Sequence, residues 1–184
     1  MGSLEIPVID VRLPIYHGVS DDVLQRGVGH MSNSSLPVGG LGTHAALTGH
    51  RGLPSAELFR HLDEVQLGDV FYIHTLDDTL AYKVDDVRIV LPTAVDWLQI
   101  DTDKDYVTLI TCDPYMINTH RLLVRGERIP YDEDKAELNV TADQESGAEQ
   151  LRSMHLLAGI IIVIALAGIC YIFFHRYRQR VRKG

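Results

Sequence analysis

Short apolar or alternating segments recur along residues 1–131, and turn-forming residues separate them. In one segment, Leu80, Tyr82 and Val84 alternate with Ala81 and Lys83, a pattern that gives a strand one buried and one wet face. Many short strands with few helices are typical of a closed, mostly-β barrel. The predicted strands cover Leu4–Ile9, Val11–Tyr16, Thr43–Thr48, Val70–His74, Leu80–Val84, Val87–Leu91, Tyr106–Thr111 and His120–Arg125.

Two helices are expected between these strands. Ser20 precedes two acidic residues, which is typical of a helix N-terminus, and Gly27 and Gly29 end that helix. Ser55 begins a second helix, which runs to about Val65 and buries a stripe of core residues at helical spacing: Leu58, Phe59, Leu62 and Val65. The connections 32–42 and 92–105 are predicted loops, the second with one helical turn near Trp97.

The last third of the chain has a different pattern. Residues 132–155 are polar and acidic without an apolar period, which predicts a juxtamembrane linker or a weak helix. Residues 156–174 carry no charge and would span about 28 Å as a helix, so they predict a transmembrane helix. Residues 175–184 are rich in arginine and favour the cytoplasmic side, which places residues 4–131 outside the cell. Residues 1–3 are typical of a cloning remnant. An exported protein would then either have lost its export signal or use the tail for export, and we expect the first.

Charge separates the body from its tail. The last 33 residues hold 6 of the 17 basic residues and no acidic ones. The preceding 151 residues therefore hold 11 basic and 25 acidic residues, a formal net charge of −14. Such an acidic body argues against a nucleic-acid partner.

The strongest chemical candidate is a thiol at the end of a predicted strand. The strand Tyr106–Thr111 leads into Cys112, and Pro114, which has no amide donor, follows closely. Arg121 lies nine residues after Cys112 on the next strand, so an antiparallel hairpin brings the two residues together. By position alone, Cys112 is more often a buried, inert thiol, and Arg121 a solvated strand residue.

A histidine candidate follows another strand. His50 lies between Gly49 and Arg51-Gly52, where flanking glycines let the backbone turn sharply and expose the imidazole. His50, Cys112 and His120 also have the residue types of zinc ligands, but they lack the short spacing that catalytic zinc sites use. We therefore expect no metal and no cofactor.

Three motifs carry a family resemblance over residues 4–131. Residues 108–112, TLITC, resemble the TLxTC motif of sortases, the cysteine transpeptidases of Gram-positive cell surfaces. Residues 48–54, TGHRGLP, resemble the histidine motif of the same family. Residues 118–126, NTHRLLVRG, resemble the pilin-polymerising class C sortases in particular, and such members commonly carry a C-terminal membrane anchor.

The resemblance implies an eight-stranded β-barrel and three catalytic residues. Cys112 would be the nucleophile, His50 the general acid and base, and Arg121 the group that orients the substrate and stabilises the oxyanion. Papain-like proteases fit less well, because there the cysteine precedes the histidine.

The resemblance also implies a substrate and an acceptor. The substrate would be a Leu-Pro-X-Thr-Gly-like sorting motif cleaved between Thr and Gly, and the acceptor a lysine amine of a pilin subunit. Two alternatives remain, a cell-wall-anchoring sortase with a peptidoglycan amine acceptor and a non-catalytic, membrane-tethered binding domain. Class C members usually also carry an N-terminal lid over the cysteine, and nothing before Leu4 resembles one.

Overall fold

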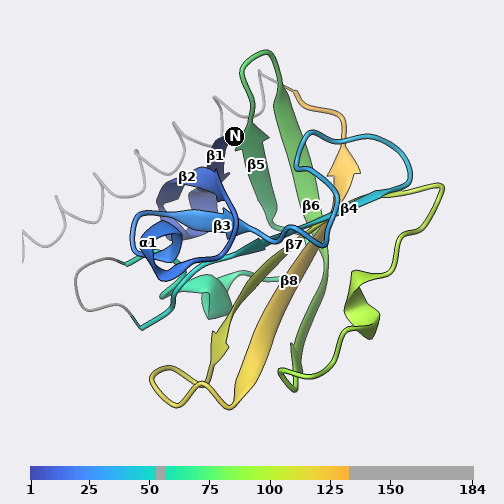
Figure 1. Cartoon of the computed structure of the whole chain (residues 1–184). Coiled ribbons are helices and arrows are strands. Elements are labelled where there is room, and N and C mark those ends of the chain that lie inside the picture. The colour runs from blue at the N-terminus through green and yellow to red at the C-terminus, as the bar shows by residue number, and fades with distance from the viewer. Residues whose placement is uncertain (53–56, 133–184) are drawn as a thin grey trace, which may run out of the picture. The chain divides into compact units, whose positions relative to one another are not determined.

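The computed structural model describes residues 1–52 and 57–132, and within them the strands close into a single barrel (Figure 1). The strand order is β1-β2-β3-β4-β7-β8-β6-β5, which confirms the predicted eight-stranded barrel. The strands are β1 Gly2–Ile6, β2 Val11–His17, β3 Val28–His30, β4 Thr43–Thr48, β5 Val70–His74, β6 Thr79–Val90, β7 Asp105–Asp113 and β8 His120–Ile129. The helices are short: η1 Pro7–Ile9, α1 Asp21–Leu24, η2 Leu62–Glu64 and η3 Asp96–Leu98.

Side chains alternate across the barrel wall, and the inward-facing set forms the main core. Leu47 of β4, Leu109 of β7 and Val124 of β8 have no exposed surface. Gly126 continues the inward row of β8, and a Cβ there would lie 2.6 Å from the ring of Phe71 and 2.9 Å from Cβ of Tyr82. Glycine at this position therefore lets β8 pass beneath those two stacked rings, whose centroids are 5.6 Å apart.

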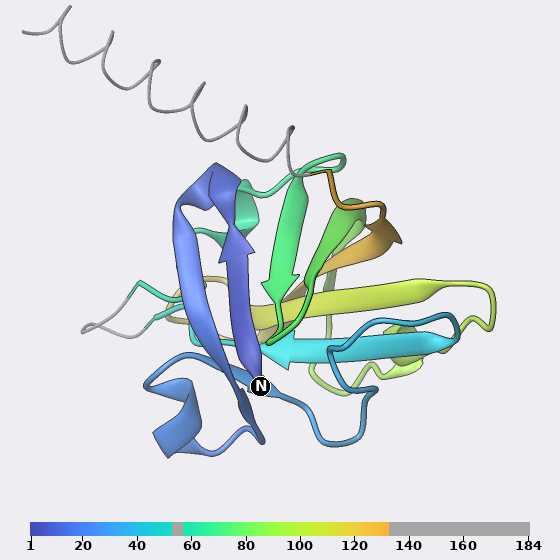
Figure 2. The same ribbon diagram turned by 90° about the horizontal axis from the view of Figure 1, so that it is seen from above.

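Parallel pairing of β4 with β7 is the topological feature that later builds the site. Thr43–Thr48 pair in register with Asp105–Ile110, and Figure 2 shows the two strands side by side. β7 then pairs antiparallel with β8 along its whole length. The C-terminal end of β7 therefore lies beside the end of β4 on one side and the start of β8 on the other.

The N-terminal strands differ from the prediction in two places. β1 ends at Ile6 because Pro7 starts a 3-10 turn, whereas we predicted a strand through Ile9. Gly2 and Ser3, expected to lie outside the domain, pair with β2 as part of β1. The short strand β3 was not predicted, since Gly29 looked like a helix terminator. A Cβ on Gly29 would lie 2.5 Å from the Gly18 carbonyl oxygen, so this glycine lets β3 pack closely against the connection that follows β2.

The predicted helix from Ser55 to Val65 is wrong over its described part. Ser55 itself lies outside the described residues, Leu58 has a φ of 39°, and only the single turn η2 is helical. The core role of the stripe is nevertheless confirmed, because Phe59 and Leu62 have no exposed surface. The apolar residues are therefore needed for the core, and a series of turns buries them in place of the predicted helix.

The predicted strands Leu80–Val84 and Val87–Leu91 form one continuous strand. β6 runs unbroken from Thr79 to Val90, with a bulge between Val84 and Asp86 where we predicted a turn. The bulge places the Asp85 carboxylate against Arg125 of β8, at 3.0 Å and 2.7 Å. Asp86 pairs in turn with Arg88 of the same strand, so both acidic residues have a cationic partner within the sheet.

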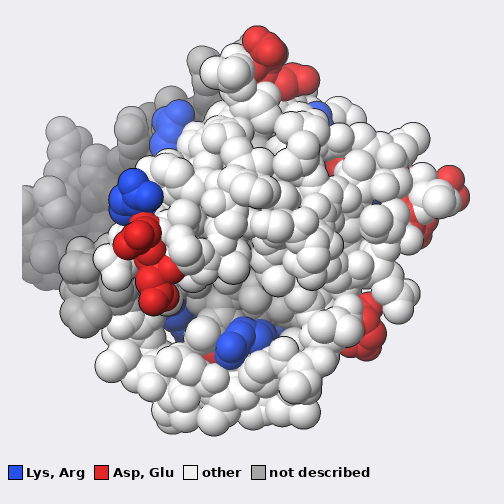
Figure 3. Space-filling view, in the orientation of Figure 1, with Lys and Arg blue, Asp and Glu red and all other residues white. Residues whose placement is uncertain are grey.

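The predicted linker, transmembrane helix and basic tail, residues 133–184, lie outside the described residues. Within residues 1–52 and 57–132, no helix has the length and apolar character needed to cross a bilayer. The face shown in Figure 3 has small, separate groups of acidic and basic side chains around a mostly uncharged centre, and no continuous basic surface.

Candidate active site

The predicted pairing of Cys112 with Arg121 is confirmed. The two residues are directly opposite each other in the β7–β8 register, so their side chains leave the same face of the sheet. Cys112 is a free, half-buried thiol at the penultimate position of β7. The strand runs two residues further than the predicted end at Thr111, to Asp113, before the loop begins.

His50 reaches the same level from the other side of β7. The parallel ladder pairs Thr48 with Ile110, so two residues further along each chain are His50 and Cys112. Backbone contact continues past the ladder, since the Gly49 amide donates to the Ile110 carbonyl at 3.1 Å. The Thr111 hydroxyl also donates to the Gly49 carbonyl at 2.8 Å. The register therefore brings the three predicted site residues to one end of β7.

The site faces outward from the barrel, next to a small buried apolar cluster. Ala46, Ile110 and Leu123 form a second buried cluster on the outer face of β4, β7 and β8. Trp97 and Leu98 of η3 pack against this cluster. η3 therefore packs over the outer face of these strands, next to Ile110, which lies two residues before Cys112 on β7.

The guanidinium of Arg121 is held by the hairpin loop. Its Nη1 donates to the His120 carbonyl at 2.8 Å and to the Asn118 carbonyl at 3.2 Å. Both acceptors are neutral, and among the described residues no carboxylate pairs with Arg121. Within the described ranges this cation therefore has no competing anion, whereas Arg125 forms a two-point ion pair with Asp85.

Arg125 has structural contacts within the barrel wall. Its guanidinium lies 4.3 Å above the Tyr106 ring, and its hydrogen bond to Asp85 raises its pKa further. Arg125 pairs in register with Thr108, four residues before Cys112. The two arginines of the motif thus have different surroundings and different distances from the thiol.

One pair of residues at the site was missed from sequence. Arg51 follows His50, Asp113 follows Cys112, and the Nη1 of Arg51 lies 2.6 Å from Oδ1 of Asp113. Both residues stand within the regions that predicted the site. Their contact depends on the strand register, which a sequence motif does not give.

The remaining histidines near the sheet have structural partners. His44 bonds through Nδ1 to the Gln99 carbonyl at 2.8 Å and through Nε2 to the Thr108 hydroxyl at 2.7 Å. Burial lowers the pKa of His44, so the ring is neutral at pH 7 and anchors the 92–105 loop to β4 and β7. Across the described ranges, no group of three or more His, Cys, Asp and Glu side chains is arranged to hold a metal ion.

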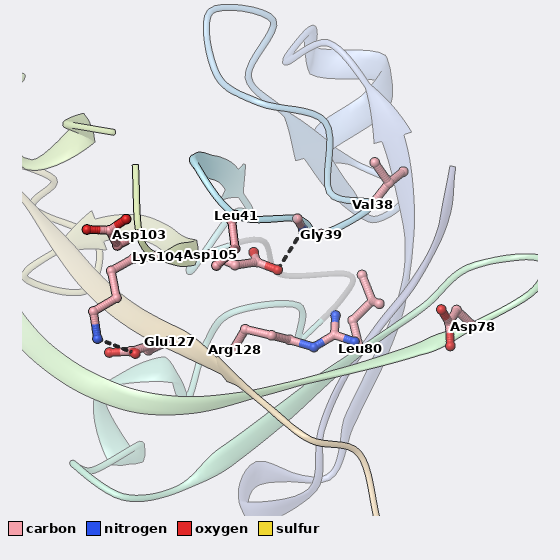
Figure 4. A pocket seen from close by; sticks show the side chains of 11 residues that line it. Val38, Gly39, Leu41, Asp78, Leu80, Asp103, Lys104, Asp105, Glu127 and Arg128 are labelled. Atoms are coloured by element: carbon pink, nitrogen blue, oxygen red, sulfur yellow. Dashed lines mark hydrogen bonds and ion pairs between the residues drawn. The ribbon is translucent and has the colours of Figure 1, made fainter. Parts of the chain in front are cut away.

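A cavity of about 490 Å³ lies elsewhere, where β7 begins and β8 ends (Figure 4). It is seven residues from Cys112 along β7, or about 23 Å at strand rise. Asp105 in its wall accepts from the Gly40 amide at 2.8 Å and the Tyr82 hydroxyl at 3.1 Å. This cavity is therefore separate from the thiol site, and its buried carboxylate is already satisfied.

Known proteins resemble this chain in both sequence and fold. A profile of the Sortase domain family matches residues 4–129. Sortase C1 from Streptococcus suis is 54% identical with a TM-score of 0.72, over 73% of this chain and 75% of that one. Streptococcus pneumoniae sortase C is 55% identical with a TM-score of 0.70, over 71% of this chain and 69% of that one. Group B Streptococcus Pilus Island 1 sortase C2 is 56% identical with a TM-score of 0.69, over 70% of this chain and 73% of that one.

The chain belongs to the sortase family, and its similarity to these class C structures supports the class C assignment. Among curated proteins, sortase D of Bacillus subtilis is 30% identical over 131 residues, 70% of this chain. The chain spans 63% of the length of that relative and 39% of the length of Streptomyces coelicolor sortase SrtE1.

Proposed function

We propose that this chain is a cysteine transpeptidase that cleaves a Leu-Pro-X-Thr-Gly-like motif between Thr and Gly. The observation that supports this most is the register that brings His50, Cys112 and Arg121 to one end of β7. A family match alone does not place a nucleophile, a proton carrier and a cation together.

The first half of the reaction would form a thioester. The Cys112 thiolate attacks the threonine carbonyl carbon, and a C–S bond forms while the carbonyl oxygen gains the negative charge. Arg121 would exchange the neutral Asn118 and His120 carbonyls for this oxyanion, a stronger charge-assisted partner. The C–N bond then breaks, and protonated His50 gives its proton to the departing glycine amine.

The second half would reverse these roles. A lysine amine attacks the thioester, neutral His50 accepts its proton, and the new amide forms as the Cys112 thiolate leaves. We propose a pilin lysine as the acceptor. Streptococcus pneumoniae sortase C is described with reference to pilin substrate specificity, and the Group B Streptococcus relative is named for a pilus island.

Incubation of the purified chain with candidate pilins tests this proposal. We expect isopeptide-linked ladders in which mass spectrometry finds a threonine carbonyl joined to a lysine ε-amine. A parallel reaction supplies a peptidoglycan-derived amine in place of the second pilin. Products with that amine alone would favour the cell-wall-anchoring alternative, and no product with either acceptor would favour a non-catalytic domain.

We also propose that residues 4–131 lie outside the cell, held by a membrane helix at 156–174 with residues 175–184 in the cytoplasm. The uncharged stretch and the arginine-rich end of the sequence support this orientation. Protease added to intact spheroplasts is expected to digest the body and spare an epitope tag on the C-terminus. Survival of the body with loss of the tag would reverse the orientation.

A further inference from the structure

Arg51 is a buried cation held by two carboxylates. Only 7% of its side chain is exposed, with Nη1 2.6 Å from Asp113 and Nη2 2.6 Å from Asp63. Its Nε also donates to the Arg60 carbonyl at 3.3 Å. A guanidinium so fully enclosed and bonded has one well-defined position.

The contact with Asp113 bridges two chain segments at the site. Arg51 follows His50 in the loop after β4, and Asp113 follows Cys112 at the end of β7. Backbone bonding between these segments ends at Gly49. After Gly49, the ion pair of Arg51 with Asp113 continues the connection between the loop that holds His50 and the strand that holds Cys112.

We infer that Arg51 and Asp113 are positioning residues that hold His50 at the height of Cys112. This inference rests on the proposed transpeptidase function for its kinetic consequence, although the geometry can be measured without that function. Proton transfer needs His50 within hydrogen-bond reach of the reacting amine, and a displacement of about 1 Å can cost on the order of 100-fold in rate. A tether one residue from each partner is well placed to prevent such a displacement.

The second carboxylate provides a matched control. Asp63 contacts the same guanidinium at the same 2.6 Å, but it belongs to η2 and is half exposed, whereas Asp113 is 16% exposed. A purely structural role for Arg51 would make both carboxylates matter through stability alone. A positioning role makes Asp113 matter for the reaction and Asp63 matter little.

The kinetic test compares Asp113→Asn, Arg51→Met, their double variant and Asp63→Asn on a sorting-motif peptide. We expect Asp113→Asn and Arg51→Met to lower kcat about 10- to 100-fold with KM within about twofold. The double variant should be no slower than the slower single one, because both remove one interaction. Asp63→Asn should keep kcat within about threefold. Thermal unfolding of every variant separates folding from rate, and equal losses of kcat in Asp113→Asn and Asp63→Asn would overturn the inference.

A second measurement does not depend on transpeptidation. A His50→Cys variant, made with Cys170→Ser so that only two thiols remain, should form an intramolecular disulfide in a glutathione buffer. Adding Asp113→Asn should slow its formation at least about tenfold, because disulfide geometry tolerates little displacement. Adding Asp63→Asn should change it less than about threefold. No disulfide in the parent variant, or no slowing by Asp113→Asn, would overturn the inference. Absence of peptide transfer by the unmodified chain would instead reject the proposed function and leave this result standing.

Discussion

Replacing Cys112 with alanine is expected to abolish transfer from a sorting-motif peptide and to leave the barrel folded. The thiolate is the proposed nucleophile, and no other cysteine is present among residues 1–151. Its side chain is half-buried at the end of β7, outside both apolar clusters, so loss of the sulfur should cost little stability. Mass spectrometry should therefore find no thioester and no ladder with the Cys112→Ala variant.

The chain contains its own control for this experiment. Cys170→Ala removes the second cysteine of the sequence, which lies outside the described residues, and should leave transfer unchanged. Circular dichroism and thermal unfolding of both variants test whether they remain folded. Unchanged peptide turnover by folded Cys112→Ala would reject the sortase mechanism. Loss of turnover in both variants would show that the effect is not specific to the site.

The barrel could be predicted from sequence because alternation and turn residues report directly on strands. The errors occur where tertiary contacts set the local structure. Asp85 and Asp86 have turn chemistry, but they lie within a bulged strand, where Asp85 pairs with Arg125 of β8 and Asp86 pairs with Arg88. Gly29 looks like a helix terminator until the nearby Gly18 carbonyl shows why a side chain would not fit. Propensity carries no information about either neighbour.

The active site also has parts that the sequence predicts and parts that depend on tertiary contacts. The closeness of Cys112 and Arg121 follows from hairpin connectivity, and the structure confirms it. The approach of His50 requires parallel pairing of two strands that are more than 55 residues apart, which only the family resemblance could suggest. The ion pair of Arg51 with Asp113 was missed, because both charges look like ordinary polar residues beside motif positions.

Arg121→Ala is expected to lower turnover by two or more orders of magnitude, comparable to the loss of an oxyanion donor. Arg121 lies directly opposite the thiol, and in the part of the chain that the structure describes its guanidinium bonds to two neutral carbonyls, which an oxyanion can replace. Arg121→Lys should recover little activity, because an ammonium lacks the planar donor fork. Steady-state rates on a sorting-motif peptide measure the effect, with circular dichroism as the folding control.

Arg125→Ala is the matched comparison on the same face of the same strand. Arg125 is four residues further along β8, about 13 Å from the position opposite Cys112, and is committed to Asp85 and the Tyr106 ring. Its removal should cost on the order of 1 kcal/mol of stability and leave kcat within about threefold. Full activity in folded Arg121→Ala would remove Arg121 from the mechanism. A loss in Arg125→Ala as large as that in Arg121→Ala would mean that charge on this strand, and not position opposite the thiol, controls the rate.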